Sequence, residues 1–169
     1  MRYTRQVLIS TLIFFVSFLL LGCSQTQQKF YDASLDGAEQ LKEAIEEANG
    51  RLILVQVGGD WCQWCVRLNQ TISEDPELLK AINERFQWVH IYFGKENKNE
   101  AAMQMLDNPT DMGFPAFVLL DAQGKVLHKI PTGGFEEGDG YDKAKLLLFI
   151  KTLQVPENLE VEEYVGMEE

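Results

Sequence analysis

The spacing of hydrophobic and polar positions between residues 34 and 153 predicts helices and strands that alternate along the chain. Apolar residues at helical spacing predict helices over residues 34–50, 62–71, 73–85, 101–106 and 141–153. Runs rich in β-branched and aromatic residues predict strands over residues 51–57, 86–93, 116–120 and 125–130. Strands that alternate with helices and end in a hairpin predict an α/β fold, a mixed sheet with helices on both faces.

Single residues predict the ends and the surroundings of some elements. Ser34 is the expected N-cap of the first helix, and Gly50 is its expected stop. The strand over residues 51–57 has too few polar interruptions for a half-exposed strand, so we expect both of its faces to be buried. Pro76 is expected in the first turn of the helix over residues 73–85, where a missing backbone N–H is tolerated.

The first 22 residues have the composition of a secretory signal peptide. Arg2 and Arg5 precede an uncharged apolar run, residues 7–21, which is shorter than the about 20 residues that a membrane-spanning helix needs. The run ends in Leu20-Leu21-Gly22-Cys23, which resembles a bacterial lipobox. This resemblance implies cleavage before Cys23 and attachment of lipid to its sulfur and its new amino group. The alternative is an uncleaved membrane anchor.

The chain is therefore expected to have four parts. They are a signal peptide (1–22), a lipidated cysteine with a polar tether (23–33), a folded domain (34–153) and an acidic tail (154–169). A composition of 46% hydrophobic and 24% charged residues suits one globular domain with appendages. The net charge of −11, without any Lys/Arg cluster, gives no basic face for nucleic acid. We expect a protein of the bacterial cell envelope, anchored by lipid and facing the extracytoplasmic side.

The chemistry is expected at Trp61-Cys62-Gln63-Trp64-Cys65, which follows the buried strand through a turn at Gly58-Gly59. Two cysteines three residues apart at a helix start share one face, so their sulfurs can bond and separate with little backbone movement. Cys62 faces unpaired backbone N–H groups and the positive end of the helix dipole, which favour its thiolate. We predict a redox pair in which Cys62 is the nucleophile and Cys65 the resolving thiol.

Two simpler interpretations of the cysteine pair are less favourable. A structural disulfide around so short a loop restricts the unfolded chain by only about 2 kcal/mol. A zinc site needs four ligands, and the chain has no second Cys pair. His90 and His128 each lie in a strand-like run, where we expect a structural hydrogen bond or exposure to solvent. With Cys23 assigned to lipid, no odd thiol remains for an oxidising compartment.

The layout resembles the thioredoxin superfamily over roughly residues 34–153. The resemblance rests on the Trp-Cys-x-x-Cys motif after a strand and on Gly113-Phe114-Pro115 before a hairpin strand. It implies a thioredoxin-like fold with a central mixed sheet of about four to five strands. It also implies that Pro115 is cis and faces a Cys62–Cys65 disulfide that opens and closes. The backbone at Phe114 would pair with an extended substrate segment.

The substrate groove implied by this resemblance surrounds the motif and the proline. Its expected residues are Trp61, Gln63, Trp64, Phe114 and Pro115. Two interpretations of the tryptophans stay open: they pack beside the motif and keep water from the disulfide, or one of them is exposed and contacts an apolar substrate segment. Trp64 is the better expected contact because it lies between the cysteines.

The sequence departs from the family at positions that concern proton transfer and redox poise. Many thioredoxins carry a buried aspartate in the strand before the motif, near the resolving cysteine, and the matching residue here is Gln56, which cannot titrate. Proton movement at Cys65 would then need water or another group. Gln63-Trp64 stands where the family often has Gly-Pro, and this dipeptide helps to set thiolate stability.

The leading hypothesis is a membrane-tethered thiol–disulfide oxidoreductase that acts on exported proteins through Cys62 and Cys65. No metal or nucleotide cofactor is implied, because the cysteine pair itself carries two electrons. The expected partners are exported proteins with thiols or disulfides, an electron donor or acceptor, and the membrane. The alternatives are a non-enzymatic binding or assembly lipoprotein with a fixed disulfide and a copper(I)-handling protein. Against copper, no Met or His cluster lies beside the motif.

Overall fold

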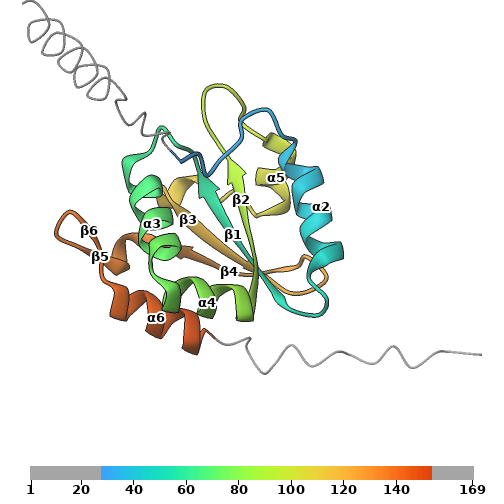
Figure 1. Cartoon of the computed structure of the whole chain (residues 1–169). Helices are drawn as coiled ribbons and strands as arrows, with labels where there is room; N and C mark the ends of the chain where they lie inside the picture. The colour runs from blue at the N-terminus through green and yellow to red at the C-terminus, as the bar shows by residue number, and fades with distance from the viewer. Residues whose placement is uncertain (1–27, 154–169) are drawn as a thin grey trace, which may run out of the picture.

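The computed structural model describes residues 28–153, whose elements follow the order predicted from the sequence (Figure 1). The helices are α2 (Gly37–Glu47), α3 (Gln63–Glu74), α4 (Pro76–Arg85), α5 (Glu100–Met105) and α6 (Lys143–Thr152), with 3-10 turns η1 (Pro109–Met112) and η2 (Thr132–Phe135). The strands are β1 (Leu52–Gly58), β2 (Phe86–Tyr92), β3 (Ala116–Leu120), β4 (Val126–Pro131), β5 (Glu136–Glu137) and β6 (Gly140–Tyr141). The predicted signal peptide, Cys23 and the acidic tail lie outside the described residues.

The central sheet has the strand order β2-β1-β3-β4 (Figure 1). β2 runs parallel to β1, because α3 and α4 return the chain to the end of the sheet where β1 began. β3 pairs antiparallel with β1, and β4 pairs antiparallel with β3. The predicted mixed sheet is confirmed with four strands, beside which β5 and β6 form a separate hairpin.

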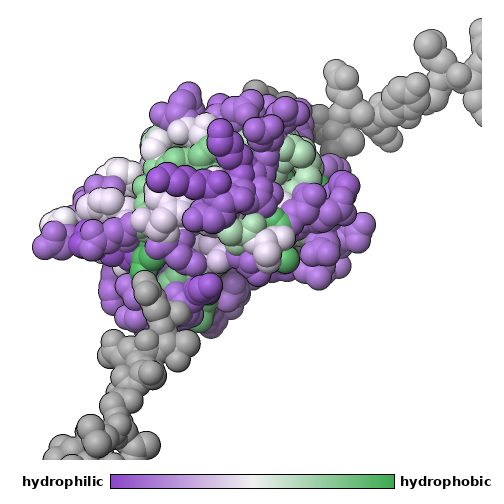
Figure 2. All heavy atoms as spheres, turned by 90° about the horizontal axis from the view of Figure 1, so that it is seen from above, coloured by the Kyte–Doolittle hydropathy of each residue, from purple (hydrophilic) through white to green (hydrophobic). Residues whose placement is uncertain are grey.

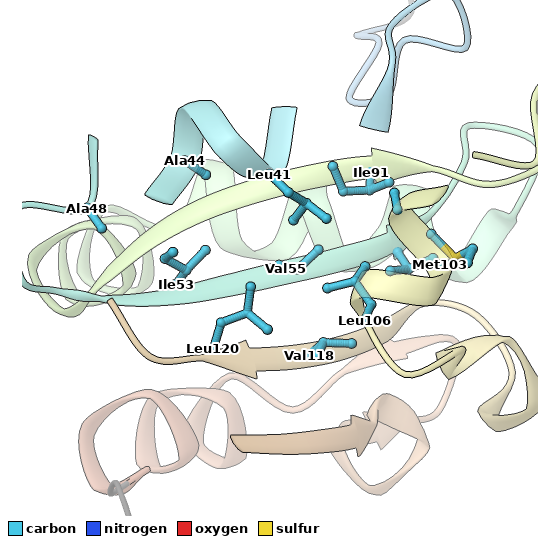
Figure 3. Close-up of a cluster of buried hydrophobic side chains, with 12 residues drawn as sticks. Leu41, Ala44, Ala48, Ile53, Val55, Ile91, Met103, Leu106, Val118 and Leu120 are labelled. Atoms are coloured by element: carbon cyan, nitrogen blue, oxygen red, sulfur yellow. The ribbon is translucent and has the colours of Figure 1, made fainter. Parts of the chain in front are cut away.

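Each face of the sheet buries its own hydrophobic cluster, because successive strand residues point to opposite faces. α2 and α5 cover one face, where Leu41 and Leu106 pack on Val55 and Val118 (Figure 3). α3, α4 and α6 cover the other face with a second cluster. This cluster consists of Leu54, Leu68, Ile72, Leu78, Ile82, Phe86, Phe117, Leu119, Tyr141, Leu146 and Ile150. The prediction of helices on both faces is confirmed, and β1 is buried from its second residue onward.

The first helix begins later than predicted, because an aspartate caps it. Asp36 accepts hydrogen bonds from the backbone N–H groups of Ala38 and Glu39, so α2 starts at the following residue. Ser34, the predicted cap, instead donates its hydroxyl to Asp32 in a local turn, at 2.6 Å. A carboxylate accepts backbone hydrogen bonds more strongly than a neutral hydroxyl does.

The segment predicted as a tether is partly folded onto the domain. Phe30, Tyr31 and Ala33 belong to a buried cluster that also contains the two cysteines of the motif. Asp60 fastens the segment by accepting hydrogen bonds from the backbone N–H groups of Phe30 at 3.2 Å and Tyr31 at 3.4 Å. The packed domain therefore begins before residue 34, because two adjacent aromatic side chains bury substantial apolar surface.

The last helix is also shorter than predicted. Residues 136–141 form the β5–β6 hairpin, which the sequence analysis did not predict, so α6 begins at Lys143 rather than at Tyr141. Asp142 caps α6, because its side chain accepts hydrogen bonds from the backbone N–H groups of Ala144 and Lys145. Two-residue strands are too short to show an alternating pattern, which explains the missed hairpin.

The surface at the end of the sheet where β1 and β2 finish is largely hydrophilic. Figure 2 looks at the molecule from the end at which β1 and β2 finish and shows hydrophobic areas only between hydrophilic side chains. None of the helices between residues 28 and 153 has both the length and the hydrophobicity needed to cross a membrane.

We expect the second cluster to depend on Phe117, which is 1% exposed and stacks on Phe149 of α6 at 5.9 Å between ring centroids. Phe117→Ala should lower the free energy of unfolding by about 3–5 kcal/mol, because it leaves a cavity between the sheet and α6. Urea denaturation followed by circular dichroism measures the loss. Leu148→Ala, at a position 62% exposed on α6, is the control and should change stability by less than about 0.5 kcal/mol. Equal stability of the two variants would contradict this packing.

Candidate functional site

Two loops meet at the edge of the sheet where β1 ends and β3 begins. Antiparallel pairing places Val57 opposite Ala116, so the chain that leaves β1 lies beside the chain that enters β3. The cysteine motif follows β1, and Pro115 directly precedes β3. As a result, Cys62 Sγ lies 3.5 Å from the carbonyl oxygen of Phe114. Residues 52 positions apart in the sequence thus form one site.

Cys62 is the N-cap of α3, the helix start at which the sequence analysis placed it. Its sulfur accepts a hydrogen bond from the backbone N–H of Cys65 at 3.2 Å. A Ser or Asp oxygen usually fills this role at a helix N-terminus. The Cys62 sulfur therefore lies at the positive end of the helix dipole, which stabilises a negative charge.

The two cysteines are free thiols with opposite electrostatic environments. A hydrogen bond from the Cys65 thiol, aided by the backbone N–H groups of Cys65 and Trp64, outweighs burial and lowers the pKa of Cys62 to about 7. Cys65 is completely buried, and its hydrogen bond to Cys62 together with burial raises the pKa of its thiol far above the ordinary value. At neutral pH, a large share of Cys62 is therefore in the thiolate form, while Cys65 keeps its proton.

The loop before β3 is held firmly against the site. The Phe114–Pro115 peptide bond is cis, which is the conformation that the family resemblance implies. Pro115 is buried, and its carbonyl accepts a hydrogen bond from the hydroxyl of Thr132 at 2.7 Å. Phe114 is half-buried, with its ring stacked on Phe93 at 5.5 Å and edge-on to Trp61 at 5.5 Å.

The two tryptophans differ in exposure. Trp61 is 55% exposed, and its indole N–H donates to the carbonyl of Phe93 at 2.9 Å. Trp64 is half-buried, because Tyr141 of β6 meets its ring edge-on at 5.6 Å and the Arg67 guanidinium lies 4.8 Å from its ring centroid. The sequence analysis favoured Trp64 as the substrate contact, but Trp61 presents more surface to solvent, as does the exposed Gln63.

An apolar groove lies beside Trp61, and the cysteines do not line it. Its volume is about 580 Å³, and its lining residues are Trp61, Phe93, Gly94, Lys95, Glu96 and Lys98. Phe114 joins the groove to the cysteines, because its ring contacts both aromatic lining residues and its carbonyl reaches Cys62. A substrate segment lying along the Phe114 backbone would therefore have hydrophobic surface beside it.

Several buried polar side chains form hydrogen bonds with one another near Cys65. The side-chain amide of Gln56 donates a hydrogen bond to the hydroxyl of Tyr31 at 2.7 Å. Asn69 is completely buried, and its side-chain oxygen is 2.6 Å from Nε2 of His90. The sequence analysis identified Gln56 but missed Tyr31, whose one local signal is an aromatic pair, Phe30-Tyr31, within an otherwise polar stretch.

The histidines have the structural roles that the sequence analysis expected. His90 is half-buried and bonded to Asn69, and burial lowers the pKa of His90 to about 4, so its ring is neutral at neutral pH. His128 is exposed on β4. Within residues 28–153, no group of three or more His, Cys, Asp or Glu side chains is arranged to hold a metal ion.

Comparisons with known proteins place this geometry in a family. Residues 38–139 match the family model described as a thioredoxin-like domain. The disulfide bond reductase DsbH of Chlamydia pneumoniae is 27% identical over 110 residues, which cover 60% of this chain and 64% of that protein. The thiol:disulfide interchange protein DsbD of Escherichia coli O6:H1 is 23% identical over 119 residues, which cover 70% of this chain and 20% of that protein. The chain thus spans less than two thirds of the length of these curated relatives.

A solved structure shares the fold. The crystal structure of a disulphide isomerase from Xylella fastidiosa Temecula1 matches with a TM-score of 0.63 and 24% sequence identity, covering 73% of this chain and 95% of that one. At this level of identity the likeness concerns the fold alone. It supports the thioredoxin-like fold predicted from the sequence.

The low pKa of Cys62 predicts how the reduced protein reacts with iodoacetamide. Only the thiolate is alkylated, so the rate should rise through a midpoint near pH 7 and level off above it, with the label on Cys62 by mass spectrometry. Cys65→Ala removes the hydrogen bond that contributes most to the shift, so its midpoint should lie at higher pH. A wild-type midpoint near the ordinary thiol pKa of about 8.5 would contradict the prediction. Equal midpoints in the two proteins would also contradict it.

Proposed function

The chain belongs to the thioredoxin-like domain family, and on that premise we propose that it is a thiol–disulfide oxidoreductase of the bacterial cell envelope, tethered by lipid on Cys23. The observation that carries the proposal is the asymmetry of the thiols. Cys62 has a pKa of about 7 at the helix start, while Cys65 is a buried, protonated thiol beneath it. The names of the two relatives, a disulfide bond reductase and a thiol:disulfide interchange protein, support the same chemistry.

The proposed reaction is a pair of thiol–disulfide exchanges. The Cys62 thiolate attacks one sulfur of a substrate disulfide and forms a mixed disulfide, while the other substrate sulfur leaves and takes up a proton. Cys65 then loses its proton and attacks the Cys62 sulfur, which closes the Cys62–Cys65 disulfide and releases the second substrate thiol. Two electrons pass from the cysteine pair to the substrate. The reverse sequence oxidises a substrate dithiol, and neither direction requires a metal or nucleotide.

The residues around Cys62 suit an extended substrate segment. The backbone at Phe114 is close enough to Cys62 for a strand paired with it to carry a substrate sulfur to the nucleophile. Trp61 and the apolar groove offer hydrophobic contact on one side of that strand. The exposed Gln63 and the half-buried Trp64, between the two cysteines, are the further proposed contacts. The proposed partners are exported proteins with thiols or disulfides, together with an electron donor or acceptor.

Trapping of the mixed disulfide tests the proposed function. Cys65→Ala cannot resolve the intermediate, so cells that produce it should accumulate covalent complexes through Cys62, visible on a non-reducing gel and abolished by dithiothreitol. The control is the Cys62→Ala/Cys65→Ala double variant, which should form none. A non-enzymatic protein with a fixed disulfide would yield no complexes from the single variant. A copper carrier would instead lose bound copper(I) in that variant.

Lipid attachment at Cys23 has a separate test. A clickable fatty acid supplied to producing cells should label the full chain, and the product should fractionate with membranes. Cys23→Ser should abolish the label while leaving the domain folded, because the packing contacts described above involve residues from Phe30 onward. An unlabelled wild-type protein in the soluble fraction would defeat the tether but not the exchange chemistry.

A further inference from the structure

Cys65 has to lose its proton before it attacks Cys62, and no carboxylate is buried in the part of the chain that the structure describes. Within residues 28–153, the buried polar side chains are Gln56, Asn69, Asn99 and Thr132. The position where related chains carry an aspartate is Gln56, whose amide neither accepts nor releases a proton at neutral pH. Another group must therefore stabilise the negative charge that forms on the Cys65 sulfur.

Tyr31 lies where such a group is needed. Its side chain is 5% exposed and packs in the same buried cluster as Cys65. Both side chains reach the same side of Gly58, because a Cβ atom on Gly58 would lie 2.5 Å from Cys65 Sγ and 3.1 Å from Tyr31 Oη. The missing side chain of this glycine leaves room for the tyrosine hydroxyl and the sulfur on the same side of β1. The Tyr31 side chain opposes the rise in the pKa of Cys65 that burial causes, as a hydrogen-bond donor to a thiolate does.

The surroundings of the Tyr31 hydroxyl keep it a donor. Tyr31 Oη accepts a hydrogen bond from Gln56 Nε2 at 2.7 Å. The hydroxyl proton of Tyr31 is therefore available for a hydrogen bond to the Cys65 sulfur. Burial, reinforced by the nearby Cys65, raises the pKa of Tyr31 well above its ordinary value. The hydroxyl thus stays protonated and cannot serve as the base.

We propose that the Tyr31 hydroxyl is a catalytic hydrogen-bond donor that stabilises the Cys65 thiolate during resolution of the mixed disulfide. The inference rests on the exchange reaction proposed above. Cys65 releases its proton to water, and the new thiolate receives the hydrogen bond of Tyr31. Its attack forms the Cys62–Cys65 bond and breaks the bond between Cys62 and the substrate sulfur, which leaves with the electron pair and takes a proton from water.

Solvent reaches the other side of this tyrosine. A cavity of about 830 Å³ is lined by residues that include Tyr31, Asp60 and His90. The Tyr31 ring meets the His90 ring edge-on at 5.3 Å, and both residues line this cavity. The N-terminal segment therefore contributes a functional side chain to a site whose other members follow β1 or precede β3.

The neighbouring tyrosines and His90 stay uncharged near neutral pH. Burial raises the pKa of Tyr141, which meets the Trp64 ring edge-on from β6, and burial likewise raises the pKa of Tyr92 to about 12. His90 stays neutral, since burial lowers its pKa to about 4. Asp60 is occupied by backbone N–H groups. Near neutral pH, the protonation of Cys62 and Cys65 therefore governs the exchange.

Release of thionitrobenzoate from equimolar dithiobis(nitrobenzoate) separates the two steps. The reduced wild-type protein should release one equivalent when Cys62 attacks and a second when Cys65 resolves the mixed disulfide. Tyr31→Phe should leave the first phase unchanged and slow the second about tenfold at pH 7, with the midpoint of its pH–rate profile moved to higher pH. Tyr92→Phe is the matched control, because Tyr92 is buried in the same cluster but its hydroxyl bonds to Glu96. Both of its phases should match the wild type.

Three results would overturn the role of Tyr31. They are an unchanged second phase, equal slowing of both phases, and an unshifted pH–rate profile. If Tyr31→Phe does not fold by circular dichroism, Gln56→Leu removes the donor that orients the hydroxyl, and an unchanged second phase in that variant is equally decisive. A wild-type protein that releases no second equivalent refutes the exchange function itself, which distinguishes that failure from the failure of Tyr31 alone.

Discussion

The antiparallel pairing of β1 with β3 is the constraint on which both the core and the site depend. Its register sets Val57 against Ala116, which brings the chain after β1 and the chain before β3 to one edge of the sheet. A slip of one residue would turn the side chains of β3 to opposite faces, taking Phe117 out of one cluster and Val118 out of the other. The same slip would move the Phe114 carbonyl away from Cys62. Hydrophobic burial on two faces thus fixes the position of a polar reaction site.

The two cysteines have the same side chain, but burial and hydrogen bonding give their thiols very different pKa values. Cys62 keeps slight exposure and caps α3, because its sulfur accepts a hydrogen bond from the backbone N–H of Cys65. Cys65 lies one turn further along the helix and is completely buried. Because the Cys65 thiol donates to the Cys62 sulfur, each pKa depends on the other group, and removing either proton changes both. The Gln63-Trp64 dipeptide spans this short interval, with Trp64 held by Tyr141.

The sequence predicts the elements whose patterns are long and the chemistry whose residues are adjacent. Helix α4, strand β1 and the cysteine motif fall into this class, because each is encoded within a dozen neighbouring residues. What it does not predict depends on contacts between distant segments. Tyr31 meets Gln56 across 25 residues, and Trp64 is covered by a strand too short to recognise. Asp36 rather than Ser34 caps α2, a choice between two good capping residues that local composition cannot make.

The packing of Tyr31 beside the redox pair has a geometric consequence for a chain held by lipid at Cys23. Tyr31 follows Cys23 by eight residues, and even a fully extended chain over that interval spans at most about 29 Å. The lipid would therefore keep the reactive sulfurs within roughly one domain diameter of the bilayer surface. With so short a connection, the cysteine pair would meet membrane-anchored proteins, or proteins emerging from the membrane, far more readily than proteins that diffuse through the compartment.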